Sequence, residues 1–219
     1  MPSSVTTIDS YSFYSCISLK SINTDNITMI KNSAFEDCYS LQSINIPNGA
    51  TSINSFTFNN CSSLQSITLP SSITSIGNNA FEGCSSLQSI TLPSSITSID
   101  NSAFSGCQSL QSITLPSSIT SIGKSAFEGC SNIRYAKINT IADITRWTYS
   151  FHYTDSINTT YDFSEVTAIP TLSSTGGLNS SSYITAIIVP DALYDDWIVA
   201  TNWSTFASKI KKASEYTYQ

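Results

Sequence analysis

The sequence predicts a solenoid, in which coils of about 23 residues stack on one another and share one continuous core. The cysteines recur with a step of 22 residues once and 23 residues four times, and a phenylalanine stands three residues before each of them. A fixed period of this length is the signature of repeat architectures. The two rows are Cys16, Cys38, Cys61, Cys84, Cys107 and Cys130, and Phe13, Phe35, Phe58, Phe81, Phe104 and Phe127.

Each coil contains a short strand that is marked by alternating apolar and polar residues. In the clearest unit, Ile90 and Leu92 are predicted to point inward, and Ser89 and Thr91 are predicted to point outward. A proline, here Pro93, ends the strand. The spacing of the apolar residues follows L-x-x-L-x-L, which predicts a leucine-rich-repeat solenoid of the repeat β/α class with short parallel strands.

A second apolar pair in the same unit, Ile96 and Ile99, predicts another short strand or turn on a different side of the coil. The unit begins at Cys84 and closes through residues 101–104, so that its residues lead the chain to the next cysteine. Together they closely resemble the BspA-like leucine-rich repeats, whose unit is roughly A-F-x-G-C-x-x-L-x-x-I-x-L-P-x-x-I-x-x-I-G. The resemblance covers about residues 5 to 139.

This resemblance implies a place and a role for the protein. Members of the family are mostly surface or secreted proteins of anaerobic bacteria and some parasitic protists, and several are associated with adhesion. We therefore expect an extracellular or cell-surface location. The first residues lack the basic start and apolar segment of a secretion signal, so this expectation assumes a leader outside the given sequence or a route without one. A solenoid scaffold does not specify its ligand.

The repeats are predicted to occupy residues 1–139 and to begin in the middle of a unit. Val5, Ile8 and Phe13 align with the second half of a later repeat, so we expect no N-terminal cap. The ends of solenoids normally need a polar cover. Our hypothesis is that a missing domain or a partner covers this end.

Residues 140–183 are predicted to form an insertion within the last coil, because the period fails after Asn139. This segment carries an alternating aromatic run, whose members would share one face of a strand. They would form either a seal over the last coil or a stacking platform for a ligand. The run comprises Trp147, Tyr149, Phe151 and Tyr153.

Residues 184–219 are predicted to supply the last repeat strand and a helical C-terminal cap. The run from Ile184 to Pro190 fits the strand frame, and Asp191 is a candidate N-cap for a helix. Apolar residues at helical spacing continue from Leu193 to Ile210, and lysines at 209, 211 and 212 suit a helix C-terminus.

The bulk composition argues against several function classes. Nine basic and fifteen acidic residues give a net charge of −6, and no basic run is present, so nucleic acid is not expected as a partner. No stretch of 18 apolar residues exists, so membrane insertion is not expected either.

Chemical motifs are sparse, and we expect no enzyme, no cofactor and no metal site. His152 is the one histidine, and no nucleophile motif accompanies it. The cysteines show neither C-x-x-C nor a Cys/His cluster. Their stacked side chains would point the same way, which suits a buried row of free thiols better than disulfides.

Two candidate binding surfaces remain. One is the aromatic run of residues 147–153. The other is the outward strand row, which is flat, uncharged and rich in hydrogen-bonding groups, although these side chains could instead serve only to keep the strands soluble. This row comprises Ser66, Thr68, Ser89, Thr91, Ser112 and Thr114, flanked by Gln42, Gln65, Gln88 and Gln111.

The sequence thus favours a non-catalytic binding or adhesion module that recognises a protein or carbohydrate ligand at a cell surface. The alternative is a structural spacer or assembly element of a larger surface protein or a phage virion.

Overall fold

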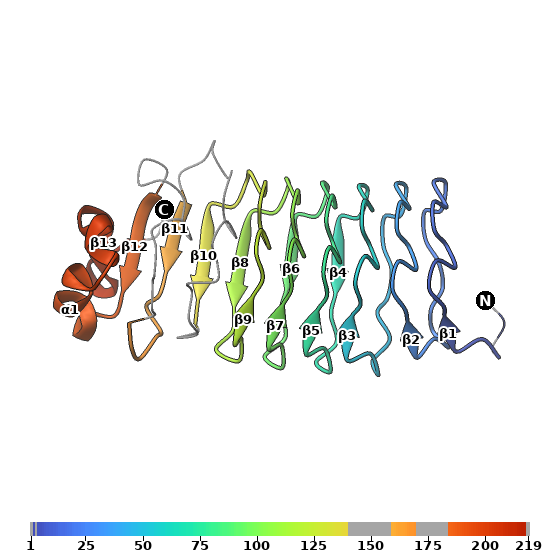
Figure 1. The fold of residues 1–219 in the computed structure, drawn as a ribbon, viewed down its shortest axis with the longest axis horizontal. Helices are drawn as coiled ribbons and strands as arrows, with labels where there is room; N and C mark the ends of the chain where they lie inside the picture. The colour runs from blue at the N-terminus through green and yellow to red at the C-terminus, as the bar shows by residue number, and fades with distance from the viewer. Residues whose placement is uncertain (1, 3, 140–158, 170–183, 218–219) are drawn as a thin grey trace.

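The chain winds into a parallel β-solenoid of about eight turns, as the repeat predicts. The structure is a computed structural model that describes residues 2, 4–139, 159–169 and 184–217. Successive coils lie side by side along one axis, with the helical segments at the C-terminal end (Figure 1).

Each regular coil contributes two strands, and both rows of strands pair in parallel. The row that we name the strand face contains β4 (Ser66–Thr68), β6 (Ser89–Thr91), β8 (Ser112–Leu115), β10 (Tyr135–Ile138), β11 (Thr159–Asp162), β12 (Ile184–Val189) and β13 (Ile210–Lys212). The second row contains β1 (Thr7–Ile8), β2 (Met29–Ile30), β3 (Ser52–Ile53), β5 (Ser75–Ile76), β7 (Ser98–Ile99) and β9 (Ser121–Ile122). The second strand predicted around Ile99 is therefore confirmed.

The third side of each regular coil, which we name the turn side, consists of turns where other solenoids of this class can hold a helix. Two left-handed residues shape it, for example Ser102 with φ 54° and Gly106 with φ 72°. The bend lets backbone groups of neighbouring coils meet, and the Phe81 N–H donates to the Ala103 carbonyl at 2.8 Å. These bonds satisfy groups that would otherwise be orphaned beside the core.

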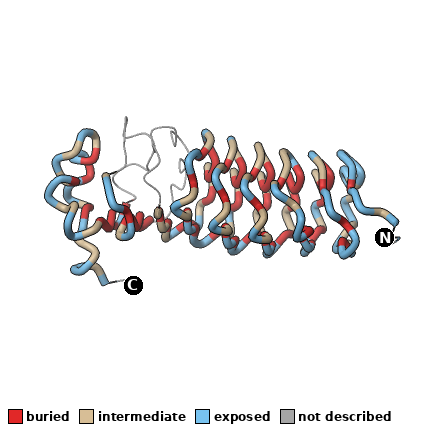
Figure 2. Tube along the Cα trace, turned by 90° about the horizontal axis from the view of Figure 1, so that it is seen from below, coloured by how far each residue is buried: buried red, intermediate tan, exposed pale blue. Residues whose placement is uncertain are grey.

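The core is a stack of identical side chains in register. The phenylalanine rings of successive coils lie nearly parallel, and the centroids of Phe81 and Phe104 are 5.3 Å apart at an interplanar angle of 6°. Both side chains are fully buried, which confirms the predicted inward orientation. The buried residues form one continuous interior along the coils (Figure 2).

Small polar side chains also tie each coil to its neighbour. The Thr97 hydroxyl donates to the Thr74 carbonyl at 3.0 Å, and the Ser95 hydroxyl donates to the Ile73 carbonyl at 2.6 Å. The same bonds recur one coil later from Thr120 and Ser118. The abundance of Ser and Thr therefore has a structural role on this side of the coils, because these hydroxyls satisfy backbone acceptors between strands.

The C-terminal coils extend the strand face beyond the regular repeats. β11 lies between β10 and β12, and β12 pairs with β13 at the end of the sheet. Residues 159–169, which fall inside the predicted 140–183 insertion, thus add a strand to the stack. Tyr161 and Phe163 from this segment are fully buried.

A compact helical cap closes the stack, as predicted, but its helices are shorter than expected. It contains η3 (Asp191–Leu193), α1 (Tyr194–Val199), η4 (Trp203–Lys209) and η5 (Ala213–Glu215). Trp197, Trp203 and Phe206 bury their rings, and Trp197 and Trp203 lie 5.4 and 5.5 Å from the Phe163 ring. Two aromatic rings of the cap therefore pack against the last coils.

Two details of the predicted cap are wrong. Residues 210–212 form strand β13 rather than a helix end, because Ile210 pairs with Ile187 and is buried there. Asp191 is not a helix N-cap: its carboxylate accepts hydrogen bonds from the backbone N–H and hydroxyl of Ser214, which lies 23 residues away. At residues 210–212 the pairing with distant β12 overrides the local helical pattern, and at Asp191 a distant hydrogen bond takes the place of the predicted cap.

Replacing Phe81 by Ala should destabilise the protein by roughly 3–5 kcal/mol, because truncation of a fully buried aromatic side chain leaves a cavity. Denaturant unfolding followed by circular dichroism measures the loss. Ser89→Ala, at an exposed position of β6, serves as the control and should change stability little. An unchanged midpoint for the Phe81 variant would contradict the proposed stacking.

Replacing Gly123 by Ala should destabilise the protein by about 1–3 kcal/mol, because the added carbon overpacks a tight contact between coils. A Cβ at residue 123 would lie 2.3 Å from the Asn101 backbone nitrogen. Gly49→Ala is a matched control, since its Cβ would meet nothing within 4 Å. Equal melting temperatures for the two variants would refute this close approach.

Candidate functional site

The outward row of the strand face is exposed, as the sequence predicts. Ser66, Thr68, Ser89, Thr91, Ser112 and Thr114 are all accessible, and the isoleucine between each pair is buried. Ser66 lies opposite Ser89, and Thr68 lies opposite Thr91, in the register of β4 and β6. Identical hydroxyls therefore repeat along the stack at the spacing of neighbouring strands, which is about 4.8 Å.

An open polar groove of about 470 Å³ runs beside this row. It is lined by Gln88, Ser109, Gln111, Asn132 and Arg134. The backbone N–H groups of Gln88, Gln111 and Arg134 bond to the preceding coil, and the Arg134 N–H donates to the Gln111 carbonyl at 3.0 Å. The side-chain amides and the guanidinium are thus placed at regular intervals, and they can donate to hydroxyl, carbonyl or carboxylate oxygens.

A second open groove, of about 550 Å³, lies at the proline corner of the early coils. Its walls combine apolar residues such as Ile27 and Pro47 with polar residues such as Asp25 and Asn45. Here the chain departs from the regular unit, since Asn48 and Gly49 stand where later coils carry two serines. The groove adjoins Thr68 and so meets the strand face.

The strand face changes character at β10. Tyr135 and Lys137 continue the two outward rows in register with Ser112 and Thr114. The Tyr135 hydroxyl donates to the Asp162 carboxylate, and Lys137 forms an ion pair with Glu165. Asp162 is only 1% exposed. The neutral hydroxyl row is therefore bounded on its C-terminal side by bonded charged and phenolic groups.

The cysteines form a row beside the phenylalanine stack. All six are free, and every one except Cys16 is buried. The Cys84 thiol donates to the Phe58 carbonyl at 3.2 Å, and the Cys107 thiol donates to the Phe81 carbonyl at 3.2 Å. Burial raises the pKa of the Cys38 thiol to about 11 and raises the pKa of the Cys61 and Cys84 thiols still further. These thiols act as small apolar groups that cap a carbonyl, not as nucleophiles.

Metal-ligating side chains do not cluster in the described ranges. No group of three or more His, Cys, Asp or Glu side chains that could hold a metal ion occurs in residues 4–139, 159–169 or 184–217. His152 and the aromatic run Trp147, Tyr149, Phe151 and Tyr153 lie outside the described residues. Among the helices that the structure describes, none has the length and apolarity needed to cross a bilayer.

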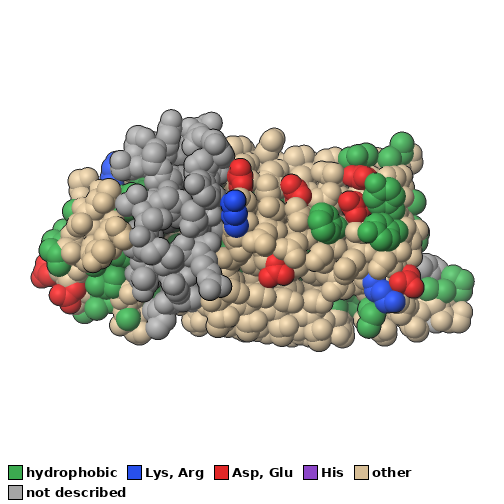
Figure 3. All heavy atoms as spheres, in the orientation of Figure 1, with side chains coloured by type: hydrophobic (Ala, Val, Ile, Leu, Met, Phe, Trp, Pro, Cys, Tyr) green, Lys and Arg blue, Asp and Glu red, His purple; other side chains and the backbone are tan. Residues whose placement is uncertain are grey.

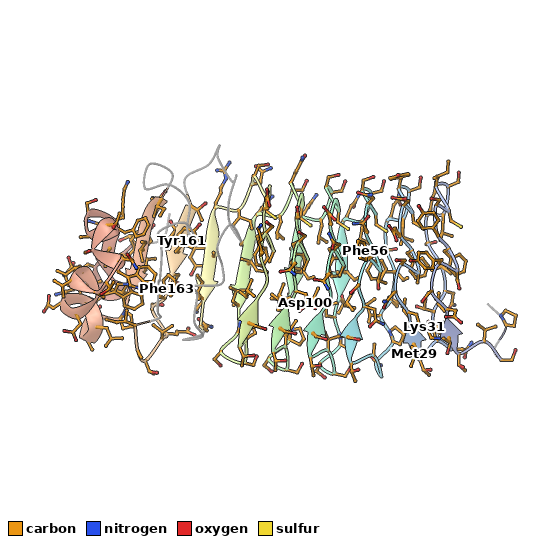
Figure 4. All side chains as sticks on the ribbon, in the orientation of Figure 1. Met29, Lys31, Phe56, Asp100, Tyr161 and Phe163 are labelled. Atoms are coloured by element: carbon orange, nitrogen blue, oxygen red, sulfur yellow. The ribbon has the colours of Figure 1, made fainter. Side chains whose placement is uncertain are left out.

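An exposed group of large hydrophobic side chains, the aromatic patch, lies on the turn side of the first coils. It consists of Tyr11, Tyr14, Ile17, Tyr39 and Phe56, which are between 38% and 62% exposed. Figure 3 shows hydrophobic side chains gathered towards the N-terminal end of this face, with acidic side chains among them. Phe56 lies on the upper part of the molecule in Figure 4, apart from Met29 and Lys31 at its lower edge.

This patch was not predicted from the sequence, because the predictions rested on the inward rows and on the outward strand row. A signal was nevertheless present: aligning the exposed positions places Phe56 against Asn79 and Ser102, and Tyr39 against Ser62 and Ser85. A bulky aromatic residue among small polar equivalents marks a surface that differs from the rest of the stack.

One family model matches most of the chain. The model for the BspA type leucine-rich-repeat region matches six copies, over residues 1–85 and 51–173. The matched region extends beyond residue 139, where the resemblance noted from the sequence ends, and it includes β11. No match was found among curated proteins.

Several solved structures share the fold. A leucine-rich repeat protein from Bacteroides ovatus is 24% identical with a TM-score of 0.50, and the match covers 84% of this chain and 59% of that chain. The leucine-rich repeat protein of T. pallidum is 21% identical with a TM-score of 0.52, over 88% and 83% of the two chains. The pneumococcal vaccine antigen PcpA is 19% identical with a TM-score of 0.61, over 83% of this chain and 41% of that chain.

These identities establish likeness of fold. The chain spans less than two thirds of the Bacteroides ovatus and pneumococcal chains.

The buried thiols should resist modification while the protein is folded. At pH 8, a thiol of pKa about 11 is ionised in roughly one molecule per thousand, and the thiolate is the reactive form. With Ellman's reagent we expect Cys16 to react first and the five buried thiols to react only in guanidinium. Cys16→Ser is the control that should abolish the early phase. Rapid reaction of several thiols in the folded protein would contradict the burial.

Proposed function

Because the chain belongs to the BspA-type leucine-rich-repeat family, we propose that it is a non-catalytic binding module that holds a protein or carbohydrate ligand at a cell surface. The observation that carries the proposal is the exposed, uncharged hydroxyl row of β4, β6 and β8 beside a groove of amide side chains.

The chemistry of this surface suits a hydroxyl-rich or extended ligand. Serine and threonine hydroxyls both donate and accept hydrogen bonds, and glutamine amides do the same with two atoms. The row is flat and repeats at the strand spacing, so a ligand that lies along the stack can form the same bond several times. Repeated weak contacts of this kind add up when one ligand spans several of them.

Arg134 gives the groove its only positive side chain among the lining residues, at the edge of the neutral row. It forms none of the ion pairs found in the described part of the chain, which join Lys31 to Asp9, Lys137 to Glu165 and Lys212 to Glu215. A guanidinium in this position can bind a carboxylate through two parallel bonds. We therefore favour a ligand that carries a carboxylate next to several hydroxyl or amide groups.

The aromatic run of residues 147–153 is proposed as a second contact for the same ligand. Alternating aromatic side chains offer stacking surfaces for a sugar ring or an apolar side chain. A location outside the cell or on its surface follows from the family resemblance and forms part of the proposal.

The alternative is a spacer or assembly element of a larger surface protein or virion. The first coil favours it, because Val5, Phe13 and Leu19 are only partly buried, and β2 is the one strand among the described residues that pairs with β1. A docked partner would cover these side chains. The two functions differ in whether the isolated chain binds a ligand.

Thr91→Lys and Thr114→Lys together should abolish binding on an array of glycans and extracellular-matrix proteins, since two ammonium groups would interrupt the neutral row. Ser121→Lys, at an exposed position of β9 in the other row, is the matched control and should bind like the unchanged chain. The Trp147→Ala/Tyr149→Ala variant tests the aromatic run in the same assay.

Binding that survives the double lysine change would remove the strand face from the proposal. The absence of any hit with the unchanged chain would favour the spacer.

A further inference from the structure

The aromatic patch occupies positions at which the later coils carry small polar residues. Tyr11 and Phe56 take the left-handed position that precedes the phenylalanine of their coils, and the later coils have Asn79, Ser102 and Ser125 there. Because the later coils stack equally well with these residues, the aromatic side chains are not needed to build the turn.

The backbone at these positions makes the aromatic residues costly. Tyr11 has φ 62° and Phe56 has φ 59°, a region in which a bulky residue is strained and Asn or Gly is favoured. Tyr11 is 62% exposed and Phe56 is 38% exposed, so burial of the rings recovers little of that cost. Strain of this kind persists where the residue serves another purpose.

Carboxylates lie among the rings. The Tyr39 side chain hydrogen-bonds to Asp37, whose negative charge raises the pKa of the Tyr39 phenol. Asp37 also accepts a hydrogen bond from the Asn60 amide at 2.9 Å. Glu36 occupies the position that corresponds to Tyr14 of the preceding coil. Neither Glu36 nor Asp37 takes part in the ion pairs that the described residues form.

We propose that the aromatic patch, with Glu36 and Asp37, is a docking surface for a basic segment of another protein, whose arginine or lysine side chains lie over the rings. The negative faces of aromatic rings attract a cation placed within about 6 Å of the ring centre. The carboxylates add a charge contact at the same place. A single arginine satisfies both features, because its planar guanidinium stacks on a ring and pairs with a carboxylate.

The net charge of the chain, −6, favours the approach of such a partner over the whole surface. A neutral sugar could stack on the rings, but it would displace water from Glu36 and Asp37 without supplying a compensating charge. The patch therefore fits a basic partner better than a neutral glycan. It lies on the turn side, away from the strand face, so this inference stands apart from the function proposed above.

A short peptide tests the surface directly. The probe is an acetylated, amidated peptide of alternating arginine and glycine, titrated into the full chain and measured by calorimetry at low and at physiological salt. We expect saturable binding that weakens as salt rises. The same peptide with citrulline in place of arginine keeps the shape and loses the charge, and it should bind at least about tenfold more weakly.

The later coils show which residues can replace the aromatic residues of the patch conservatively. Tyr11→Asn, Tyr39→Ser and Phe56→Asn place at each position a residue that later coils carry there, namely Asn79, Ser85 and Asn79 again. This triple variant should lose peptide binding at least about tenfold. Its melting temperature should not fall, because Asn tolerates the left-handed backbone better than an aromatic residue does.

Two control variants distinguish the aromatic patch from the strand face. Asp37→Asn, which gives residue 37 the side chain that Asn60 has in the next coil, should weaken the arginine peptide and leave the citrulline peptide unchanged. The Thr91→Lys/Thr114→Lys variant of the strand face should bind the arginine peptide like the unchanged chain.

Three results would overturn the proposal: no binding of the arginine peptide, equal binding of the citrulline peptide, or full binding by a folded triple variant. If a neutral oligosaccharide bound at the patch and the peptide did not, the partner would be a glycan instead of a basic segment.

Discussion

Everything in this molecule depends on adjacent coils meeting in register. In a single coil, neither strand has a partner for its backbone donors, and the phenylalanine has no second ring to pack against; the next coil supplies both. Phe81 packs face to face with Phe104, while its N–H bonds to Ala103. The same step brings the Cys107 thiol to the Phe81 carbonyl. Packing and hydrogen bonding thus impose one register on the inward positions of neighbouring coils, and a coil out of register would lose both.

This constraint divides each coil into two kinds of position. Inward positions must repeat, because an altered volume would be felt by the coils on either side. Outward positions can vary, and the chain uses them differently along its length: hydroxyls on β4, β6 and β8, then Tyr135 and Lys137 on β10. The turn side shows the same freedom, since one backbone position holds Phe56 in one coil and Ser102 in another. Both surfaces proposed for binding consist of such variable positions.

The sequence predicts the fold well where contacts are set by the period and poorly where they are set by distant partners. The inward Phe81 and the outward Ser89 follow from counting, because successive coils up to β8 repeat them. The strand at Ile210 could not be predicted by counting, since a helical spacing of apolar residues there hides a pairing with Ile187. The role of the Asp191 carboxylate was mispredicted for the same reason, because it accepts hydrogen bonds from Ser214, which lies across the cap. For the candidate site, the exposed hydroxyl row was predictable, whereas the polar groove needed the positions of Asn132 and Arg134 in space.

The three central coils contain the same 13-residue segment, at 64–76, 87–99 and 110–122. Gene segments that encode near-identical units recombine readily, and the coils they encode are interchangeable within the stack. Gain or loss of one unit would shift the tyrosine-bearing coils relative to the tryptophan cap by one strand spacing, roughly 5 Å, without altering either end. The length of the protein can therefore evolve separately from its recognition chemistry, and relatives of different reach can present the same surfaces.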